Sequence, residues 1–223
     1  IGNVVITGNT KIGNNNTFYP FSTIGSEPQD LKYKGEKSFL FIGNHNTFRE
    51  YVTVNTGTEG GGLKTIIENN CLFMVSSHIA HDCIIKSNVI LANNATLAGH
   101  VEIFENAVLG GNSAVHQFVK IGKYAMIGGM SGVEKNIIPY SLYTGIRSEL
   151  KGMNIIGLKR KGLNSKKINE ILKIVKSIFC SDNSIEQNIN SLSKDMLIVD
   201  EIAEIVDFIK KYKKRGICRL IDD

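Results

Sequence analysis

Apolar residues recur at every sixth position through the middle of the chain. Counting in steps of six, twelve consecutive positions carry an aliphatic or aromatic side chain: Ile67, Phe73, Ile79, Ile85, Leu91, Leu97, Ile103, Leu109, Val115, Ile121, Ile127 and Val133. Four positions after each of them, the residue is mostly small or β-branched: Cys71, Ser77, Cys83, Val89, Ala95, Val101, Ala107, Ser113, Val119, Ala125, Ser131 and Ile137. Neither the period of an α-helix nor that of a β-strand with one buried face produces this spacing. A period of six predicts a parallel β-helix in which three hexapeptides form one triangular coil around an apolar core.

The same register continues on the N-terminal side, where two loops interrupt it. The positions in phase are Ile12, Phe18, Ile24, Ile42, Phe48 and Val54. The step from Ile24 to Ile42 equals three hexapeptides, the length of one coil, so residues 26–41 are predicted to leave the helix and rejoin it in phase. The step from Val54 to Ile67 exceeds two hexapeptides by one residue, and this phase shift predicts a second loop at residues 57–65. Because the chain begins in the middle of the pattern, we expect N-terminal coils to be missing from it.

The periodicity becomes helical toward the C-terminus. The hexapeptide pattern stops near Pro139, and from Asn164 onward apolar residues recur at helical spacing. Two amphipathic helices are predicted, with buried faces made by Ile168, Ile171, Leu172, Val175, Ile178 and Phe179 in the first and by Ile202, Ile205, Val206 and Ile209 in the second. We therefore predict a β-helix over residues 1–145 and a helical domain over residues 146–223.

Charge distinguishes the two parts of the chain. The net charge is +5, with 26 Lys and Arg against 21 Asp and Glu. Residues 1–150 hold 11 of each sign, whereas residues 151–223 hold 15 basic and 10 acidic residues, including the run KKYKKR at 210–215. An acidic partner, nucleic acid or a membrane surface would suit such a region, and so would a simply solvated helical face. The chain contains no run of eighteen apolar residues, so a transmembrane segment is not expected.

Four of the five histidines fall between residues 78 and 116: His78, His81, His100 and His116. With three hexapeptides per coil, His81 is predicted to stack on Gly99 and then on Gln117, while Asp82 stacks on His100. Three interpretations remain open at this point. The histidines could pack a subunit contact, bind zinc, or provide a general base next to the carboxylate of Asp82. Their spacing along the chain differs from that of the close histidine pair in zinc-binding β-helix enzymes.

Several short segments of the sequence help to choose between these interpretations. The segments SEPQDLKY, IAHDC, LANNATLAGHV, AVHQF and NIIGLKRKG occur in this order along the chain. Together they resemble the UDP-N-acetylglucosamine O-acyltransferases of lipid A biosynthesis, within the hexapeptide-repeat acyltransferases. The resemblance implies an all-β left-handed parallel β-helix with a C-terminal α-helical domain, assembled as a homotrimer in the cytoplasm. It also implies two substrates, UDP-N-acetylglucosamine and a 3-hydroxyacyl chain on acyl carrier protein, and it requires no metal and no organic cofactor.

The same resemblance assigns roles to individual residues. His81 is expected to be the general base on the 3-hydroxyl of the sugar, Gly99 the backbone donor to the oxyanion, and Asp82 the partner that orients His81. The residues expected to bind substrate are Gln29, Asp30, Lys32, His78, His100, His116, Gln117, Asn154, Arg160 and Lys161. The residues expected to limit the length of the acyl chain are Gly129, Met126 and Met130.

The basic C-terminal run has a matching partner in this interpretation, because acyl carrier protein is acidic. Nucleic acid is not favoured, since aromatic residues do not alternate with the basic ones in a known binding motif. Two alternatives remain from the sequence: the related glucosamine N-acyltransferase of the same pathway, and a hexapeptide scaffold without catalysis. Ile156 departs from the pattern, because it occupies a position where an acidic residue is expected.

Overall fold

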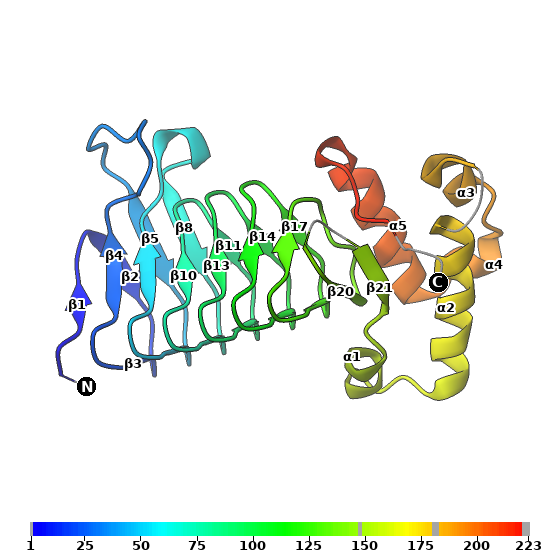
Figure 1. Ribbon diagram of the computed structural model, residues 1–223, viewed down its shortest axis with the longest axis horizontal. Coiled ribbons are helices and arrows are strands. Elements are labelled where there is room, and N and C mark those ends of the chain that lie inside the picture. The colour runs from blue at the N-terminus through cyan, green and yellow to red at the C-terminus, as the bar shows by residue number, and fades with distance from the viewer. Residues whose placement is uncertain (1, 147–148, 180–182, 220–223) are drawn as a thin grey trace.

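The computed structural model describes residues 2–146, 149–179 and 183–219 of the chain. A parallel β-helix forms its longer part, and a group of helices lies at the C-terminal end (Figure 1). The first face of the β-helix contains β1 (Val5–Ile6), β4 (Thr23–Ser26), β7 (Thr53–Asn55), β10 (His78–Ile79), β13 (Thr96–Leu97), β16 (Ala114–Val115) and β19 (Gly132–Val133). The second face contains β2 (Asn9–Ile12), β5 (Phe39–Ile42), β8 (Lys64–Ile67), β11 (Ile84–Ile85), β14 (Glu102–Ile103) and β17 (Lys120–Ile121). The third face contains β3 (Thr17–Phe18), β6 (Thr47–Phe48), β9 (Leu72–Phe73), β12 (Ile90–Leu91), β15 (Val108–Leu109), β18 (Met126–Ile127), β20 (Ser141–Thr144) and β21 (Glu149–Met153).

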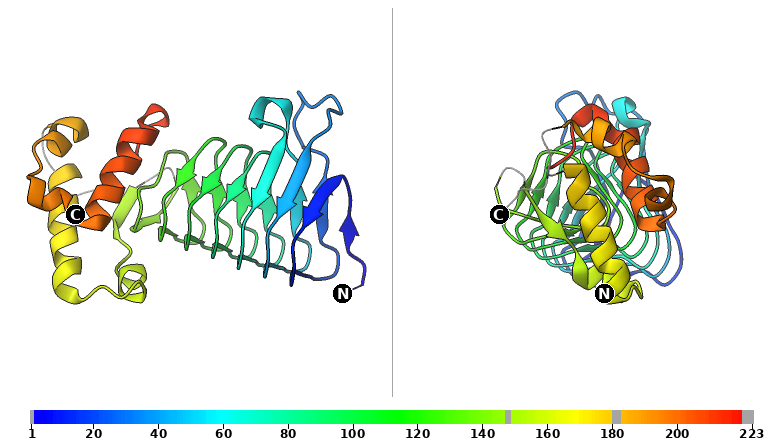
Figure 2. Two further views of the ribbon diagram at one scale, coloured as in Figure 1. Left: turned by 180° about the vertical axis from the view of Figure 1, so that it is seen from behind. Right: turned by 90° about the vertical axis from the view of Figure 1, so that its right-hand side faces the viewer.

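The strand register confirms the coil length that the sequence predicts. His78 pairs with Thr96, and Ile84 pairs with Glu102, so each partner lies three hexapeptides further along the chain. All pairs between successive coils are parallel, and only β20 and β21 pair in the antiparallel sense among the strands of the described residues. The coils therefore stack directly on one another, as the right-hand view of Figure 2 shows along the length of the molecule.

Each hexapeptide places one apolar residue inside the coil and turns the chain at the next corner. The periodic residues from Ile67 to Val133 and the small residues between them are buried. At the corners the backbone enters the left-handed region once in each hexapeptide, for example at Asn88, Asn94 and Asn106. Asn tolerates this conformation better than most residues, because its short amide forms local hydrogen bonds. Asp82 and His100 occupy two of these corners, with φ of 59° and 62°.

The first loop rejoins the helix in phase, but the step from Ile24 to Ile42 does not correspond to one coil. Ile24 pairs with Val54 on the first face, and Ile12 pairs with Ile42 on the second, so each pair spans five hexapeptide lengths where a regular coil spans three. Two hexapeptide lengths are therefore inserted between two adjacent faces. The second loop is shorter, since Thr53 pairs with His78 at a separation of 25 positions. Both loops project from the same edge of the β-helix and lie side by side (Figures 1 and 2).

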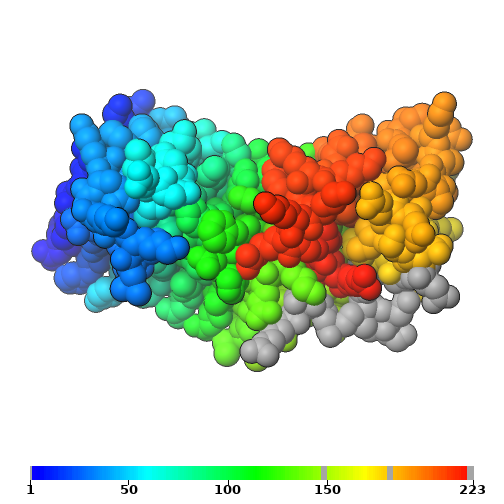
Figure 3. Space-filling model, turned by 90° about the horizontal axis from the view of Figure 1, so that it is seen from above, coloured from blue at the N-terminus to red at the C-terminus, as the bar shows by residue number. Residues whose placement is uncertain are grey.

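The C-terminal part contains five α-helices among the described residues, and α5 packs against the coils. The helices are α1 (Ile155–Arg160), α2 (Ser165–Phe179), α3 (Ile185–Asn190), α4 (Lys194–Leu197) and α5 (Asp200–Tyr212), and two 3-10 helices are η1 (Glu59–Gly61) in the second loop and η2 (Lys213–Arg215) after α5. The predicted apolar faces of α2 and α5 are buried, with Leu172 partly so. In the space-filling view, the end of α5 lies against the coils coloured green (Figure 3). The predicted domain division after residue 145 falls between the paired strands β20 and β21, and it stays a prediction.

None of the helices in the described ranges combines the length and the apolar character needed to cross a membrane.

Candidate active site

His81 and Asp82 form a hydrogen-bonded pair at the corner that follows β10. The Nδ1 atom of His81 lies 2.8 Å from Oδ2 of Asp82. Both residues are buried, with 9% and 6% of their surfaces exposed. Adjacent side chains meet here because the left-handed backbone at Asp82 turns the chain sharply between the two faces.

The second loop holds the carboxylate of Asp82 from the other side. The backbone amide of Thr58 donates to both oxygens of Asp82, at 2.9 and 3.1 Å, and the Thr58 hydroxyl donates to Oδ2 at 2.5 Å. The backbone amide of Asp82 donates to Oγ1 of Thr65 at 2.8 Å. Sequence reasoning identified the loop by its phase shift but missed Thr58 and Thr65, because hydrogen bonds across 24 and 17 residues leave no local pattern.

These contacts favour the ionised form of the Asp82 carboxylate. Burial acts to raise the pKa of Asp82, but hydrogen bonds from His81 and Thr58 favour the ionised form, and the pKa lies below its ordinary value. An ionised carboxylate only accepts hydrogen bonds, so His81 carries its proton on Nδ1. The second ring nitrogen, Nε2, then has a free lone pair, as a general base requires.

Gly99 lies directly against the free side of this imidazole. A Cβ atom added to Gly99 would lie 2.4 Å from Cε1 and 2.5 Å from Nε2 of His81, so only glycine leaves room for the ring. Within the described ranges, the backbone amide of Gly99 has no hydrogen-bond partner. The Gly99 corner thus offers an unpaired donor beside the base.

His100 and His78 complete the cluster. His100 lies one coil beyond Asp82, with Nδ1 3.8 Å from Oδ2 of Asp82, and its ring stacks on Phe118 at a centroid distance of 4.3 Å. Burial lowers the pKa of His100, although the charge of Asp82 opposes this effect. His78 faces Oγ1 of Thr53 at 2.7 Å through Nδ1, and burial lowers its pKa as well.

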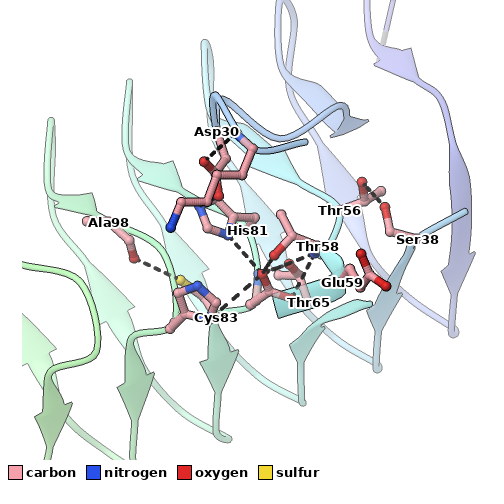
Figure 4. Close-up of polar contacts among 12 residues, drawn as sticks. Asp30, Ser38, Thr56, Thr58, Glu59, Thr65, His81, Cys83 and Ala98 are labelled. Atoms are coloured by element: carbon pink, nitrogen blue, oxygen red, sulfur yellow. Dashed lines mark hydrogen bonds and ion pairs between the residues drawn. The ribbon is translucent and has the colours of Figure 1, made fainter. Parts of the chain in front are cut away.

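A groove of about 710 Å³ opens over the pair, and we call it the histidine groove. It is lined by Gln29, Asp30, Leu31, Lys32, His78, Ala80, His81, Thr96, Leu97, Ala98, Gly99, His100, Gln117 and Phe118. The first loop contributes Asp30, whose Oδ2 lies 4.0 Å from Nε2 of His81 (Figure 4). The structure therefore brings eight of the residues predicted from the sequence to a single surface.

The remaining predicted residues lie elsewhere on the chain. His116 is exposed, with Nδ1 2.6 Å from Nη2 of Arg215. Lys161 is bound to Oε1 of the buried Glu201 at 2.6 Å. The others outside the groove are Met126 in β18, the corner residues Gly129 and Met130, Asn154, which caps α1, and the exposed Arg160 at the end of that helix. Within one chain none of these residues lines the histidine groove, and their roles stay predictions.

One group in the described part of the chain has the composition of a metal site. The ligand atoms of His81, Asp82 and His100 lie within 4.8 Å of one another. Coordination would require Asp82 to exchange its hydrogen bonds with His81 and Thr58 for the metal, because Oδ2 already accepts from both.

Known proteins resemble the chain over almost its full length. Residues 136–218 match the family described as UDP N-acetylglucosamine O-acyltransferase, domain 2, and residues 64–99 match the bacterial transferase hexapeptide family. The acyl-[acyl-carrier-protein]–UDP-N-acetylglucosamine O-acyltransferase of Thermodesulfovibrio yellowstonii is 46% identical over 219 residues, covering 98% of this chain and 84% of that protein. The enzyme of the same name from Rickettsia rickettsii (strain Sheila Smith) is 52% identical over 216 residues, covering 97% of this chain and 82% of that protein.

Solved structures agree with these relatives. The UDP-N-acetylglucosamine acyltransferase of Bacteroides fragilis superimposes with a TM-score of 0.93 at 38% identity, covering 98% of this chain and 85% of that one. A further crystal structure of a UDP-N-acetylglucosamine acyltransferase gives a TM-score of 0.92 at 40% identity, with 98% and 84% covered. With this identity over nearly the whole chain, the protein belongs to the acyl-[acyl-carrier-protein]–UDP-N-acetylglucosamine O-acyltransferase family.

Proposed function

We propose that the protein transfers a 3-hydroxyacyl chain from acyl carrier protein to the 3-hydroxyl of UDP-N-acetylglucosamine, the first step of lipid A biosynthesis. One observation carries the proposal for this chain. The imidazole of His81, oriented by the buried carboxylate of Asp82, presents Nε2 to the histidine groove directly beside the unpaired amide of Gly99. A base next to an oxyanion donor is the arrangement that acyl transfer to a hydroxyl needs.

The reaction follows from this arrangement. Nε2 of His81 takes the proton of the 3-hydroxyl while the sugar oxygen attacks the thioester carbonyl. The carbonyl oxygen becomes an oxyanion, which accepts a hydrogen bond from the amide of Gly99. When the intermediate collapses, the C–S bond breaks and the thiolate takes the proton from His81. The ester, the carrier thiol and the neutral imidazole result, so no metal, cofactor or covalent enzyme intermediate is needed.

Substrate binding is assigned around this centre. The nucleotide sugar is proposed to contact Gln29, Asp30, Lys32, His78, His100 and Gln117, which line the histidine groove, with His116, Asn154, Arg160 and Lys161 as further contacts. The acyl chain is proposed to end near Gly129, between Met126 and Met130. Because these two sets lie on separate surfaces of one chain, a homotrimer of left-handed β-helices would bring them together at the subunit contacts. Acyl carrier protein as the donor would place the reaction in the cytoplasm.

The test compares His81→Ala with His45→Asn in an assay of acyl transfer from 3-hydroxyacyl carrier protein to UDP-N-acetylglucosamine. His45 is the matched control, because it occupies an exposed corner away from the histidine groove, with φ of 59°, and Asn suits that backbone. Sedimentation first establishes that each variant has the same assembly as the wild type. We expect His81→Ala to lose about 10²- to 10⁴-fold in kcat, the usual contribution of a general base, and His45→Asn to retain wild-type turnover.

The outcomes separate the alternatives. Turnover of His81→Ala at the wild-type rate would remove the base from the mechanism. A correctly assembled wild type that fails with UDP-N-acetylglucosamine but acylates UDP-3-O-acylglucosamine would identify the related N-acyltransferase. Absence of turnover with both acceptors would favour a scaffold without catalysis.

A further inference from the structure

The hydroxyl of Thr58 is used in an unusual way. Thr58 occupies the N-cap position of η1, where a threonine side chain ordinarily accepts a hydrogen bond from the helix itself. Here it makes no such bond, and its hydroxyl donates to Oδ2 of Asp82 at 2.5 Å instead. Thr58 is itself buried, with 5% of its surface exposed. The loop therefore directs a capping side chain toward the catalytic pair.

We propose that Thr58 is a positioning residue for the acyl transfer, acting on His81 through Asp82. The inference rests on the proposed function, since it assigns a role in that reaction to a residue outside the histidine groove. Oδ2 of Asp82 receives hydrogen bonds from His81 and from the Thr58 hydroxyl, while Oδ1 receives the Thr58 amide. These donors fix the plane of the carboxylate, and the carboxylate in turn fixes the plane of the imidazole.

Water cannot readily replace the hydrogen bond from the Thr58 hydroxyl, because the carboxylate of Asp82 is buried. The side chain of Asp82 is only 1% exposed, so a carboxylate that loses the hydroxyl stays desolvated, and only the Thr58 amide and His81 then hold it against rotation about its terminal bond. A rotation moves Oδ2 away from Nδ1 of His81. Nε2 on the opposite side of the ring then leaves the position beside Gly99. Small displacements of this kind reduce kcat more than they reduce binding.

The second loop is shaped to make this contact possible. A Cβ atom on Gly61 would lie 1.9 Å from Cγ of Asp82, so the loop closes over the carboxylate only with glycine at this position. Glu36 in the first loop accepts hydrogen bonds from the amides of Lys34 and Glu59, at 2.8 and 3.1 Å. The loop that orients the base is thereby tied to the loop that brings Asp30 to the groove.

Thr58→Val tests the hydroxyl alone, because valine keeps the branched shape and the backbone amide. We expect kcat to fall roughly tenfold while KM for both substrates stays unchanged, and we expect Thr58→Ser to restore most of the rate. Thr56→Val is the matched control. Thr56 is buried at the base of the same loop, and its hydroxyl accepts a hydrogen bond from Ser38 at 2.8 Å without touching Asp82. Its replacement should lower the melting temperature without lowering kcat.

A double-mutant cycle with Asp82→Asn distinguishes positioning from a general loss of structure. If Thr58 acts through Asp82, Thr58→Val should reduce kcat in the wild type but have little further effect in Asp82→Asn. Wild-type kcat in Thr58→Val, or an equal loss in both backgrounds, would overturn the inference. If the wild type turns over and its turnover depends on His81, the proposed function stands whatever the result for Thr58. If the wild type shows no turnover, the proposed function is itself wrong.

Discussion

At the scale of single residues, the site depends on two backbone features. One is the left-handed corner at Asp82, and the other is the space left by the missing side chain of Gly99. Asp82 has φ of 59°, in the region that most residues avoid, and this turn directs its carboxylate to the preceding residue. Gly99 has an ordinary backbone conformation, so its glycine is required for space and not for φ. The imidazole of His81 therefore lies close to the amide of Gly99, because Gly99 carries only a hydrogen atom where any other residue would have a side chain.

Gly99→Ala is expected to reduce kcat strongly without unfolding the protein. The new methyl group would meet Cε1 and Nε2 of His81 at 2.4 and 2.5 Å and would displace the ring. A displaced base costs about 10²-fold in kcat, because the hydroxyl and Nε2 no longer align. Steady-state kinetics and thermal unfolding would measure both effects.

Gly132→Ala serves as the control for this change. Gly132 lies in β19 on the same face of the β-helix, and an added Cβ would meet no atom within 4 Å. It should retain wild-type kcat and melting temperature. Wild-type kcat in Gly99→Ala would mean that the imidazole can work from another position.

At the scale of elements, asparagine side chains join successive coils at a corner of the N-terminal part. Asn46 is completely buried, and its side chain donates to the carbonyl of Glu68 at 2.8 Å and accepts from the amide of Cys71 at 2.8 Å. Its own amide donates to Oδ1 of Asn16 in the preceding coil at 2.9 Å. One side chain thereby satisfies backbone groups that the short strands leave unpaired.

Asn46→Ala is predicted to destabilise the β-helix by roughly 2–4 kcal/mol, because it leaves two buried backbone groups without partners. Chemical denaturation, followed by circular dichroism at fixed protein concentration, would measure the difference. Asn93→Ala is the matched control at an exposed corner and should change the stability by less than about 0.5 kcal/mol. Equal stability of the two variants would show that the buried hydrogen bonds of Asn46 contribute nothing to the free energy of unfolding.

At the scale of the whole molecule, the basic run at residues 210–215 divides between two surfaces. Lys211, Lys214 and Arg215 line a hollow of about 420 Å³ with Phe118, Lys120, Asn136 and Tyr212, which we call the lysine hollow. Phe118 also lines the histidine groove, so the two surfaces adjoin at this residue. Lys210 and Lys213 line a different cavity together with Glu186. Only part of the basic run therefore faces the proposed reaction.

Lys214→Glu is expected to raise KM for acyl carrier protein several-fold at low salt and to leave KM for UDP-N-acetylglucosamine unchanged. A cationic surface beside the groove attracts an acidic carrier, and added salt screens this attraction. Lys213→Glu makes the same charge change one residue earlier, where Nζ lies 3.8 Å from Oε1 of Glu186 on the other surface. If both variants raise KM equally, the attraction depends on net charge and not on the lysine hollow.

The sequence by itself determined the coil, the two loops and the helical end, because a period of six allows one arrangement of short parallel strands. It also placed His81, Gly99 and His100 on adjacent coils, since stacked positions are separated by three hexapeptides. The size of the first loop depended on the tertiary structure, because a step of three hexapeptides fits either one coil or an insertion between two faces.

Only the tertiary structure decided how the catalytic pair is held and which basic residues face it. Thr58 meets Asp82 across 24 residues, and Arg215 meets His116 across 99, through loops and helices whose path no local pattern records. Residues within the repeat are predictable because each coil repeats the geometry of the preceding one. Residues on the inserted loops and the C-terminal helices depend on packing between distant segments, which is fixed only when the whole chain folds.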